Sequence, residues 1–95
     1  MANSGQISII WSDYMMYRMN LRKFNKSKIE SVLRYSTERY FDHATHRRIA
    51  IGHHDRVLVM IPYEQSGETI TPVTIHAITR GQINFRIKTG RFKNE

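Results

Sequence analysis

The spacing of apolar residues changes near residue 37, and that change limits the possible folds more than any other feature of the sequence. Before it, apolar residues recur three and four positions apart, which is the period of an amphipathic helix. After it, apolar and polar residues alternate, which is the period of a strand. Because 95 residues can bury only one limited core, we expect helices and sheet to pack together in a single domain.

Two helices are predicted in the first part of the chain, after a short β-rich segment over residues 6–11. Ser12 can cap the first helix, which should continue to about Lys23. Two groups on this helix are expected to face the core, an apolar stripe and a methionine cluster. They consist of Tyr14, Tyr17, Leu21 and Phe24, and of Met15, Met16 and Met19.

The second helix is marked by the sequence Ser27-Lys28-Ile29-Glu30, which has the form of a capping box. It should end near Ser36. The apolar residues that follow the box share one face, and they are Ile29, Val32 and Leu33.

Four strands are predicted after residue 37, over residues 39–42, 46–52, 57–61 and 68–78. The third is apolar on both faces, which is typical of a central strand, and Pro62 lies near its end. Pro72 inside the last strand indicates a bulge or an unpaired stretch there, because proline has no backbone N–H.

A final helix is predicted from the second capping box, Thr79-Arg80-Gly81-Gln82, to Gly90, with Ile83 and Ile87 one turn apart. The fold class is therefore α+β. We expect a mainly antiparallel sheet of four to five strands, with two N-terminal helices and one C-terminal helix, in one domain over residues 4–92.

The charge of the chain points to an acidic partner. Fifteen Lys and Arg residues against eight Asp and Glu residues give a net charge of +7, and a pI of about 10.2 is typical of a nucleic-acid-binding domain. Ten of the fifteen cations are arginine, whose planar fork suits phosphate. RNA is the favoured partner. A basic surface that only maintains solubility is the alternative.

Several classes of protein are disfavoured by the composition. The chain has no cysteine, which excludes disulfides and thiolate metal sites. No apolar run approaches the 18 or so residues that span a bilayer, and the first residues do not resemble a signal peptide. We therefore expect a cytoplasmic protein with no membrane partner.

The strongest candidate for chemistry is His76, which lies at the end of a predicted strand, with Arg80 at the start of the helix that follows. A strand end beside a helix N-terminus can bind an anion. There an imidazole can transfer a proton and a guanidinium can stabilise a phosphorane-like transition state. The alternative is a buried, hydrogen-bonded core histidine beside a solvated cap residue.

Other cations and one aromatic residue are weaker candidates for contact with RNA. Arg18 and Arg22 lie one turn apart on the first helix, and they could equally form a solvated helix edge. Alternation sends Arg47 and Arg48 to opposite faces of the sheet. Tyr63 could donate a hydrogen bond to phosphate or stack on a base, and it could equally be a half-buried aromatic residue at a strand end. Arg86 is the cation farther along the last helix.

Metal binding is not predicted, and neither is a cofactor. The remaining histidines lie in a turn and at strand ends, without the three or four regularly spaced ligands of a zinc site. They are His43, His46, His53 and His54, the last followed by Asp55. We interpret them as solvated loop residues.

Four segments carry a resemblance to a known family. They are Ser12-Asp13-Tyr14 with Tyr17-Arg18-Met19, residues 29–34, residues 45–52, and residues 75–92 from Ile75-His76 to Arg91-Phe92. Together these segments resemble a bacterial domain family of unknown function that is itself similar to the BrnT toxins. BrnT-like toxins belong to the RelE-like group of small basic ribonucleases, which pair with antitoxins and block translation by cutting RNA.

The resemblance implies a RelE-like sheet and metal-independent cleavage, in which the 2′-hydroxyl of RNA attacks the neighbouring phosphate. Arg80 matches the basic position after the last strand, and Arg48 matches a basic residue on the mid-sheet strand. Tyr14 stands where related chains often carry a histidine, and Gly81-Gln82 interrupts the usual basic cluster. An inactive binding module of the same fold therefore stays open.

Three functional hypotheses follow. The first is an endoribonuclease toxin that acts on RNA, including ribosome-associated mRNA, and pairs with an acidic antitoxin. In it His76 is the acid or base, Arg80 and Arg48 stabilise phosphate charge, and Tyr63 orients the substrate. The nucleic-acid-binding residues would be Arg18, Arg22, Arg47 and Arg86. The second is a non-catalytic nucleic-acid-binding module, and the third is a protein that docks on an acidic protein chain.

Overall fold

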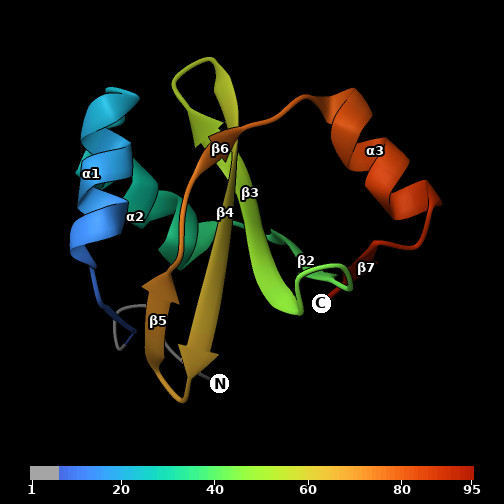
Figure 1. The fold of residues 1–95 in the computed structure, drawn as a ribbon, viewed down its shortest axis with the longest axis horizontal. Helices are drawn as coiled ribbons and strands as arrows, with labels where there is room; N and C mark the ends of the chain where they lie inside the picture. The colour runs from blue at the N-terminus through green and yellow to red at the C-terminus, as the bar shows by residue number, and fades with distance from the viewer. Residues whose placement is uncertain (1–6) are drawn as a thin grey trace.

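A computed structural model describes residues 7–95, so residues 4–6 of the predicted domain and the start of the first predicted strand lie outside the described chain. One sheet separates helices α1 and α2 from helix α3, and the short strand β6 lies between them (Figure 1). In chain order the elements are β1 (Ser8–Ile9), α1 (Asp13–Leu21), α2 (Lys26–Tyr35), β2 (Glu38–Asp42), β3 (Arg47–His54), β4 (Val57–Ser66), β5 (Thr69–Pro72), β6 (His76–Ala77), α3 (Arg80–Lys88) and β7 (Phe92–Asn94).

The α+β class and the placement of the three helices are confirmed, whereas the sheet has more strands than predicted. In the described chain it contains seven strands in the order β1-β5-β4-β3-β2-β7, with β6 paired to β4. All pairs are antiparallel except β1 with β5. The additional strand β7 pairs with β2 and lies partly beyond the predicted domain end at Phe92.

Two prolines explain how the last predicted strand is divided. Pro72 ends β5, and the chain pairs with β4 again only at β6, so the predicted interruption is confirmed. Pro62 lies inside β4 rather than near its end. It falls where β4 has changed neighbour, since β5 pairs with residues 63–66 and β6 with residues 59–60. A residue without an N–H is therefore tolerated in a central strand.

The helix starts follow capping chemistry in each case, although one cap was predicted at the wrong residue. The Ser12 side chain accepts a hydrogen bond from Met15 N at 3.1 Å, as predicted. The capping box of Thr79 with Gln82 is also present. Helix α2, however, is capped by Asn25 rather than by Ser27, and the Asn25 side-chain oxygen accepts a hydrogen bond from Lys28 N at 3.1 Å. Asparagine is at least as good an N-cap as serine, so the earlier residue starts the helix.

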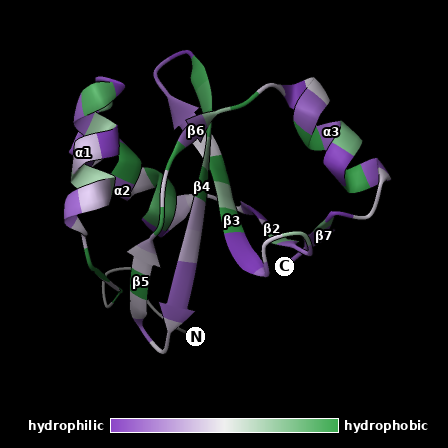
Figure 2. Ribbon diagram, viewed as in Figure 1, coloured by the Kyte–Doolittle hydropathy of each residue, from purple (hydrophilic) through white to green (hydrophobic). Residues whose placement is uncertain are grey.

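Each face of the sheet carries its own half of the core. Helices α1 and α2 cover one face, α3 covers the other, and β3 changes from hydrophilic at its start to hydrophobic in its middle (Figure 2). The α1–α2 side contains Met15, Met19, Ile29, Val32, Leu33, Ala50, Val59, Ile61, Tyr63, Ile70 and Ile75. The α3 side contains Tyr40, Ile49, Ile51, Met60, Ile78, Ile83 and Phe92.

The predicted apolar stripe of the first helix is wrong for three of its four residues, since only Phe24 packs against the core, and the methionine prediction is confirmed. Met15 and Met19 are fully buried and Met16 is half-buried, whereas Tyr14 and Tyr17 are 57% and 60% exposed. Leu21, on the same side as the tyrosines, is 56% exposed. The helix turns Met15 and Met19 toward the core that they share with residues of β4 and β5, where flexible thioether side chains adapt to the available space. No helix of the described residues is long and apolar enough to cross a membrane.

Gly52 on β3 allows α2 to approach the sheet closely. A Cβ atom at this position would lie 2.7 Å from Val32 Cγ1 and 2.8 Å from Val32 Cγ2. Val32 is β-branched and buried, so it cannot move away without disturbing the packing of α2.

Replacing Gly52 by Ala should therefore lower the free energy of unfolding by about 1–3 kcal/mol through overpacking. Urea unfolding followed by circular dichroism measures the change. Gly81→Ala is the matched control, because its nearest neighbour, Thr79 Oγ1, would lie 3.9 Å away. That variant should be as stable as the parent or gain up to about 1 kcal/mol in α3. Equal midpoints for Gly52→Ala and the parent would contradict the close contact.

Candidate nucleic-acid interface

The edge strand β6 brings His76 to the α3 side of the sheet. His76 pairs with Met60 of β4, so the two side chains share a face, and Met60 belongs to the core under α3. The His76 side chain is half-buried. Because β6 lies at the edge of the sheet, residues of α1 can also reach the imidazole from the opposite side (Figure 1).

Arg18 of α1 makes that contact. Its Nη2 donates to the backbone oxygen of Ile75 at 3.2 Å and lies 3.3 Å from His76 Nδ1. A guanidinium has no acceptor, so in this hydrogen bond Nδ1 must accept. The neutral imidazole then carries its proton on Nε2, and Nε2–H is the donor that a ligand can use.

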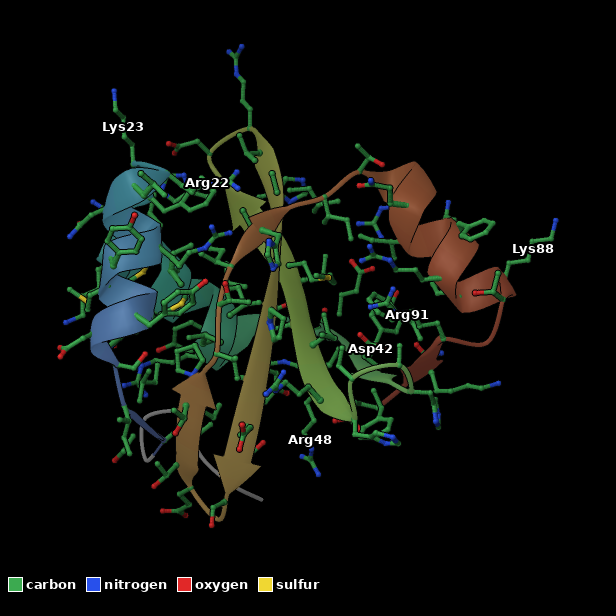
Figure 3. The ribbon with its side chains drawn as sticks, viewed as in Figure 1. Arg22, Lys23, Asp42, Arg48, Lys88 and Arg91 are labelled. Carbon is green, nitrogen blue, oxygen red and sulfur yellow. The ribbon has the colours of Figure 1, made fainter. Side chains whose placement is uncertain are left out.

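Two further arginines act on the same imidazole. Arg22, at the end of α1, is exposed and lies between α1 and β6 (Figure 3). Arg86 of α3 is held by a hydrogen bond to Met60 Sδ at 3.3 Å, and its guanidinium lies 5.5 Å from the ring centre of Phe92. We call His76 with Arg18, Arg22 and Arg86 the His76 cluster.

The charges that act on His76 are all positive. Burial lowers the pKa of His76 most, and Arg18, Arg22 and Arg86 lower it further. The imidazole is therefore neutral at pH 7. None of these three arginines forms an ion pair with a carboxylate within residues 7–95. Cations that are not neutralised by carboxylates create a positive potential, which attracts anions.

Two buried polar atoms near the cluster lack a partner among the described residues. They are Arg18 Nε and Thr74 Oγ1, one on the guanidinium that contacts Ile75 and the other on the residue before Ile75. A buried donor without an acceptor is costly, and such atoms are satisfied by water or by a ligand.

Arg80 lies outside the cluster. Its guanidinium forms a double hydrogen bond with Glu38, at 2.5 and 3.0 Å, and the pKa of Glu38 is lowered mainly by this bond. Glu38 and His76 are the ends of one cross-strand row, Glu38–Ile51–Met60–His76. Three strand spacings of about 4.8 Å separate them by about 14 Å. Arg80 thus binds a carboxylate three strands from the histidine with which the sequence grouped it.

Arg48 and Tyr63 lie on the other face of the sheet. They pair across β3 and β4, and Tyr63 is 3% exposed in the core under α1 and α2, with the guanidinium of Arg39 5.5 Å from its ring centre. Arg48 Nε lies 3.3 Å from a carboxylate oxygen of Glu95. In this arrangement Tyr63 cannot stack on a base, and neither residue shares a site with His76.

Arg47 is also separate from the cluster. It is the first residue of β3, and its Nε lies 3.8 Å from Glu64 Oε1. The structure therefore brings together one predicted catalytic residue and three predicted RNA-binding residues, and it distributes the other four elsewhere. The signal that could have united Arg18 and Arg22 with His76 is the edge position of β6, which depends on the split at Pro72.

The remaining histidines do not assemble a metal site. The prediction of a solvated loop residue is wrong for His54, which is buried at the end of β3 and accepts a hydrogen bond from Asn25 N through Nε2 at 2.8 Å. His54 therefore joins the β3–β4 hairpin to the start of α2. Its ring also packs edge-on against Phe24. His53 is exposed, as are His43 and His46. Within the described chain, no group of three or more His, Cys, Asp or Glu residues could hold a metal ion.

Comparison with known proteins leaves the geometry as the main guide to function. No protein-family model, no curated protein and no solved structure matches the chain. The similarity to the BrnT and RelE groups is therefore still a prediction from the sequence.

Replacing Arg22 by Gln should raise the pKa of His76, because one positive charge that opposes protonation is removed. An NMR titration of the imidazole C–H signals measures the shift. Arg47→Gln, which removes a charge outside the cluster, should leave the titration of His76 unchanged. A shift of equal size in both variants would mean that only net charge matters.

The same pKa has a consequence for stability. Because the folded pKa of His76 lies below its ordinary value of 6.5, the unfolded chain binds a proton first as the pH falls. The contribution of this site is therefore present above about pH 6.5 and is lost as the pH falls toward the folded pKa. Arg22→Gln should reduce that loss in urea titrations at successive pH values.

Proposed function

We propose that the protein binds RNA through the His76 cluster. The observation that carries this proposal is the contact of Arg18 with the half-buried His76, whose imidazole also feels the positive charges of Arg22 and Arg86. None of the three arginines has a carboxylate partner within residues 7–95. Five of the other arginines pair with carboxylates, which leaves the cluster as a concentrated source of positive potential on a chain of net charge +7.

A phosphodiester fits the donors of this site. Guanidinium N–H groups match phosphate oxygens in pairs, and the His76 Nε2–H adds a neutral donor. A bound phosphate oxygen would also supply an acceptor for Arg18 Nε, which lacks one within residues 7–95. The resemblance to BrnT-like ribonucleases favours RNA over DNA as the source of the phosphate, and an acidic antitoxin is the protein partner that it implies.

RNA cleavage is the second candidate function, and the neutral state of His76 favours it. A general base must be neutral before it can accept a proton, and His76 is neutral at pH 7. Its Nδ1 lone pair is occupied by Arg18. Transfer of Arg18 from Nδ1 to the phosphate would release that lone pair to accept a proton.

The chemical step is a transesterification. The 2′-hydroxyl oxygen forms a bond to the adjacent phosphorus and gives its proton to His76, while the bond from phosphorus to the 5′ oxygen breaks. The imidazole proton passes to the departing 5′ oxygen through solvent, leaving a 2′,3′-cyclic phosphate and a 5′-hydroxyl. The arginines stabilise the extra negative charge of the transition state.

Replacing Arg22 or Arg86 by Gln should weaken RNA binding and reduce the slope of log affinity against log salt by about 0.7–1 each, because each variant loses one phosphate contact. Fluorescence anisotropy of a labelled single-stranded RNA at several salt concentrations measures both quantities. The control Arg47→Gln removes the same charge at the end of β3 and should keep the parent's slope. Identical losses in all three variants would assign binding to net charge and contradict a local site.

Replacing His76 by Gln should abolish cleavage while RNA binding falls only slightly, because the amide keeps a donor but cannot exchange a proton at neutral pH. Labelled RNA incubated in chelator and separated on a denaturing gel measures the product. Intact RNA with the parent protein, despite binding, would establish a binding module. Equal cleavage by parent and variant would exclude His76 as the base.

The variant Arg80→Gln tests whether Arg80 takes part in cleavage, as the resemblance implies, or only pairs with Glu38, as the geometry indicates. The sequence resemblance predicts loss of cleavage in this variant, whereas the pairing of Arg80 with Glu38 predicts that cleavage is retained. The same gel assay gives the answer, with thermal unfolding as the control for the broken ion pair.

A further inference from the structure

Helix α1 presents an unexplained row of exposed aromatic and aliphatic side chains. Tyr14 is 57%, Tyr17 60% and Leu21 56% exposed, although the helix has a buried face formed by Met15 and Met19. Large apolar side chains that repeat at helical spacing on an exposed face are typical of a binding surface.

The row lies directly beside the His76 cluster. With about 100° per residue, Arg18 is about 40° around the helix from Tyr14, and Arg22 about 80°. The buried Met15 and Met19 come next, at about 100° and 140°. The two arginines therefore separate the tyrosines from the core, and Tyr14 lies one turn, about 6 Å along the axis, before Arg18.

We infer that Tyr14 and Tyr17 stack on unpaired bases of single-stranded RNA whose backbone phosphate is bound by Arg18 and Arg22. This inference rests on the proposed function and names its substrate class, an RNA strand with accessible bases. Stacking of bases on aromatic rings beside a cationic track is how single strands are bound without sequence readout. A base in a duplex already stacks on its neighbours, so it has no free face on which the tyrosine rings could stack.

The charge next to the row favours a nucleic acid over a second protein chain. Arg18 and Arg22 lie beside the tyrosines, Lys23 follows the helix, and the only carboxylate in α1 is Asp13 at its first residue. An apolar seam for a second copy of this chain would place these cations against their own counterparts and raise the cost of association. A strand of phosphates brings the opposite charge, and its bases supply flat apolar surfaces.

The test measures by fluorescence anisotropy how tightly the protein binds three labelled ligands. They are a short uridine-rich single-stranded RNA, the same RNA with stable abasic spacers at its central positions, and a duplex of equal length. Tyr14→Ala and Tyr17→Ala should each weaken binding to the base-bearing single strand about 5- to 30-fold. Binding to the abasic strand and to the duplex should stay at the parent's level.

Two matched variants control for the ring and for its position. Tyr17→Phe keeps an aromatic ring and should bind the single strand as the parent does. Tyr35→Ala removes an equally exposed tyrosine, 63% exposed, from α2 and should also bind as the parent does. Circular dichroism verifies the helix content of each variant.

The other outcomes overturn the inference. If the parent binds the single strand but Tyr14→Ala and Tyr17→Ala do not weaken it, or weaken the abasic strand equally, the rings do not stack on bases and the phosphate site stands alone. If the parent binds none of the ligands, the proposed function fails as well. If sedimentation shows that Tyr14→Ala dissociates a dimer without changing RNA affinity, the row is a protein interface.

Discussion

The proposed site depends on one half-buried guanidinium, that of Arg18. Its Nη2 joins α1 to the Ile75 carbonyl and to His76 Nδ1, while its Nε has no acceptor within the described chain. A cation removed from water without a carboxylate is costly, and removing its hydrogen-bond partners would make it costlier. The same contact determines which nitrogen of His76 carries the proton. An anion at this position would satisfy Arg18 and use the potential that surrounds it.

Several arginines are used to hold the fold together and so are not free to bind a ligand. Arg91 donates to both oxygens of the buried Asp42, at 2.9 and 3.0 Å, and so joins β7 to the end of β2 (Figure 3). Burial raises the pKa of Asp42, but hydrogen bonds from Arg91 and the Ala44 N–H outweigh it, and the pKa is lowered overall. This stabilisation is therefore present above the ordinary pKa of 3.8 and is lost in stronger acid. Arg39 is used in another way, since it donates to the Leu33 and Ser36 carbonyls at the end of α2. Because such pairs occupy much of the positive charge, net charge alone is a poor guide to the site.

The sequence predicted what depends on local chemistry and missed what depends on pairing. The change of period near residue 37, the Ser12 cap and the capping box at Thr79 are each determined by neighbouring residues, and all three agree with the structure. The face of α1 was predicted wrongly because tyrosine and methionine are both apolar, and only the shape of the sheet decides which of them is buried. The site was divided for a similar reason. Arg80 is near His76 in sequence but reaches Glu38, whereas the arginine that contacts His76 is Arg18 of α1, more than fifty residues earlier.

If the His76 cluster binds RNA as proposed, its arrangement would make binding and proton transfer depend on each other. Without a ligand, Arg18 occupies the Nδ1 lone pair, and burial together with the arginines keeps the pKa of His76 low, so the imidazole is neutral but a poor base. In the proposed complex, a phosphate would attract Arg18 away from Nδ1 and place a negative charge beside the ring. The first effect frees the lone pair, and the second raises the pKa of His76, because a nearby anion favours the charged imidazole. In the proposed complex such an imidazole would become an effective base only with RNA bound, so free protein and complex should differ in the protonation of His76 even if the RNA is never cut.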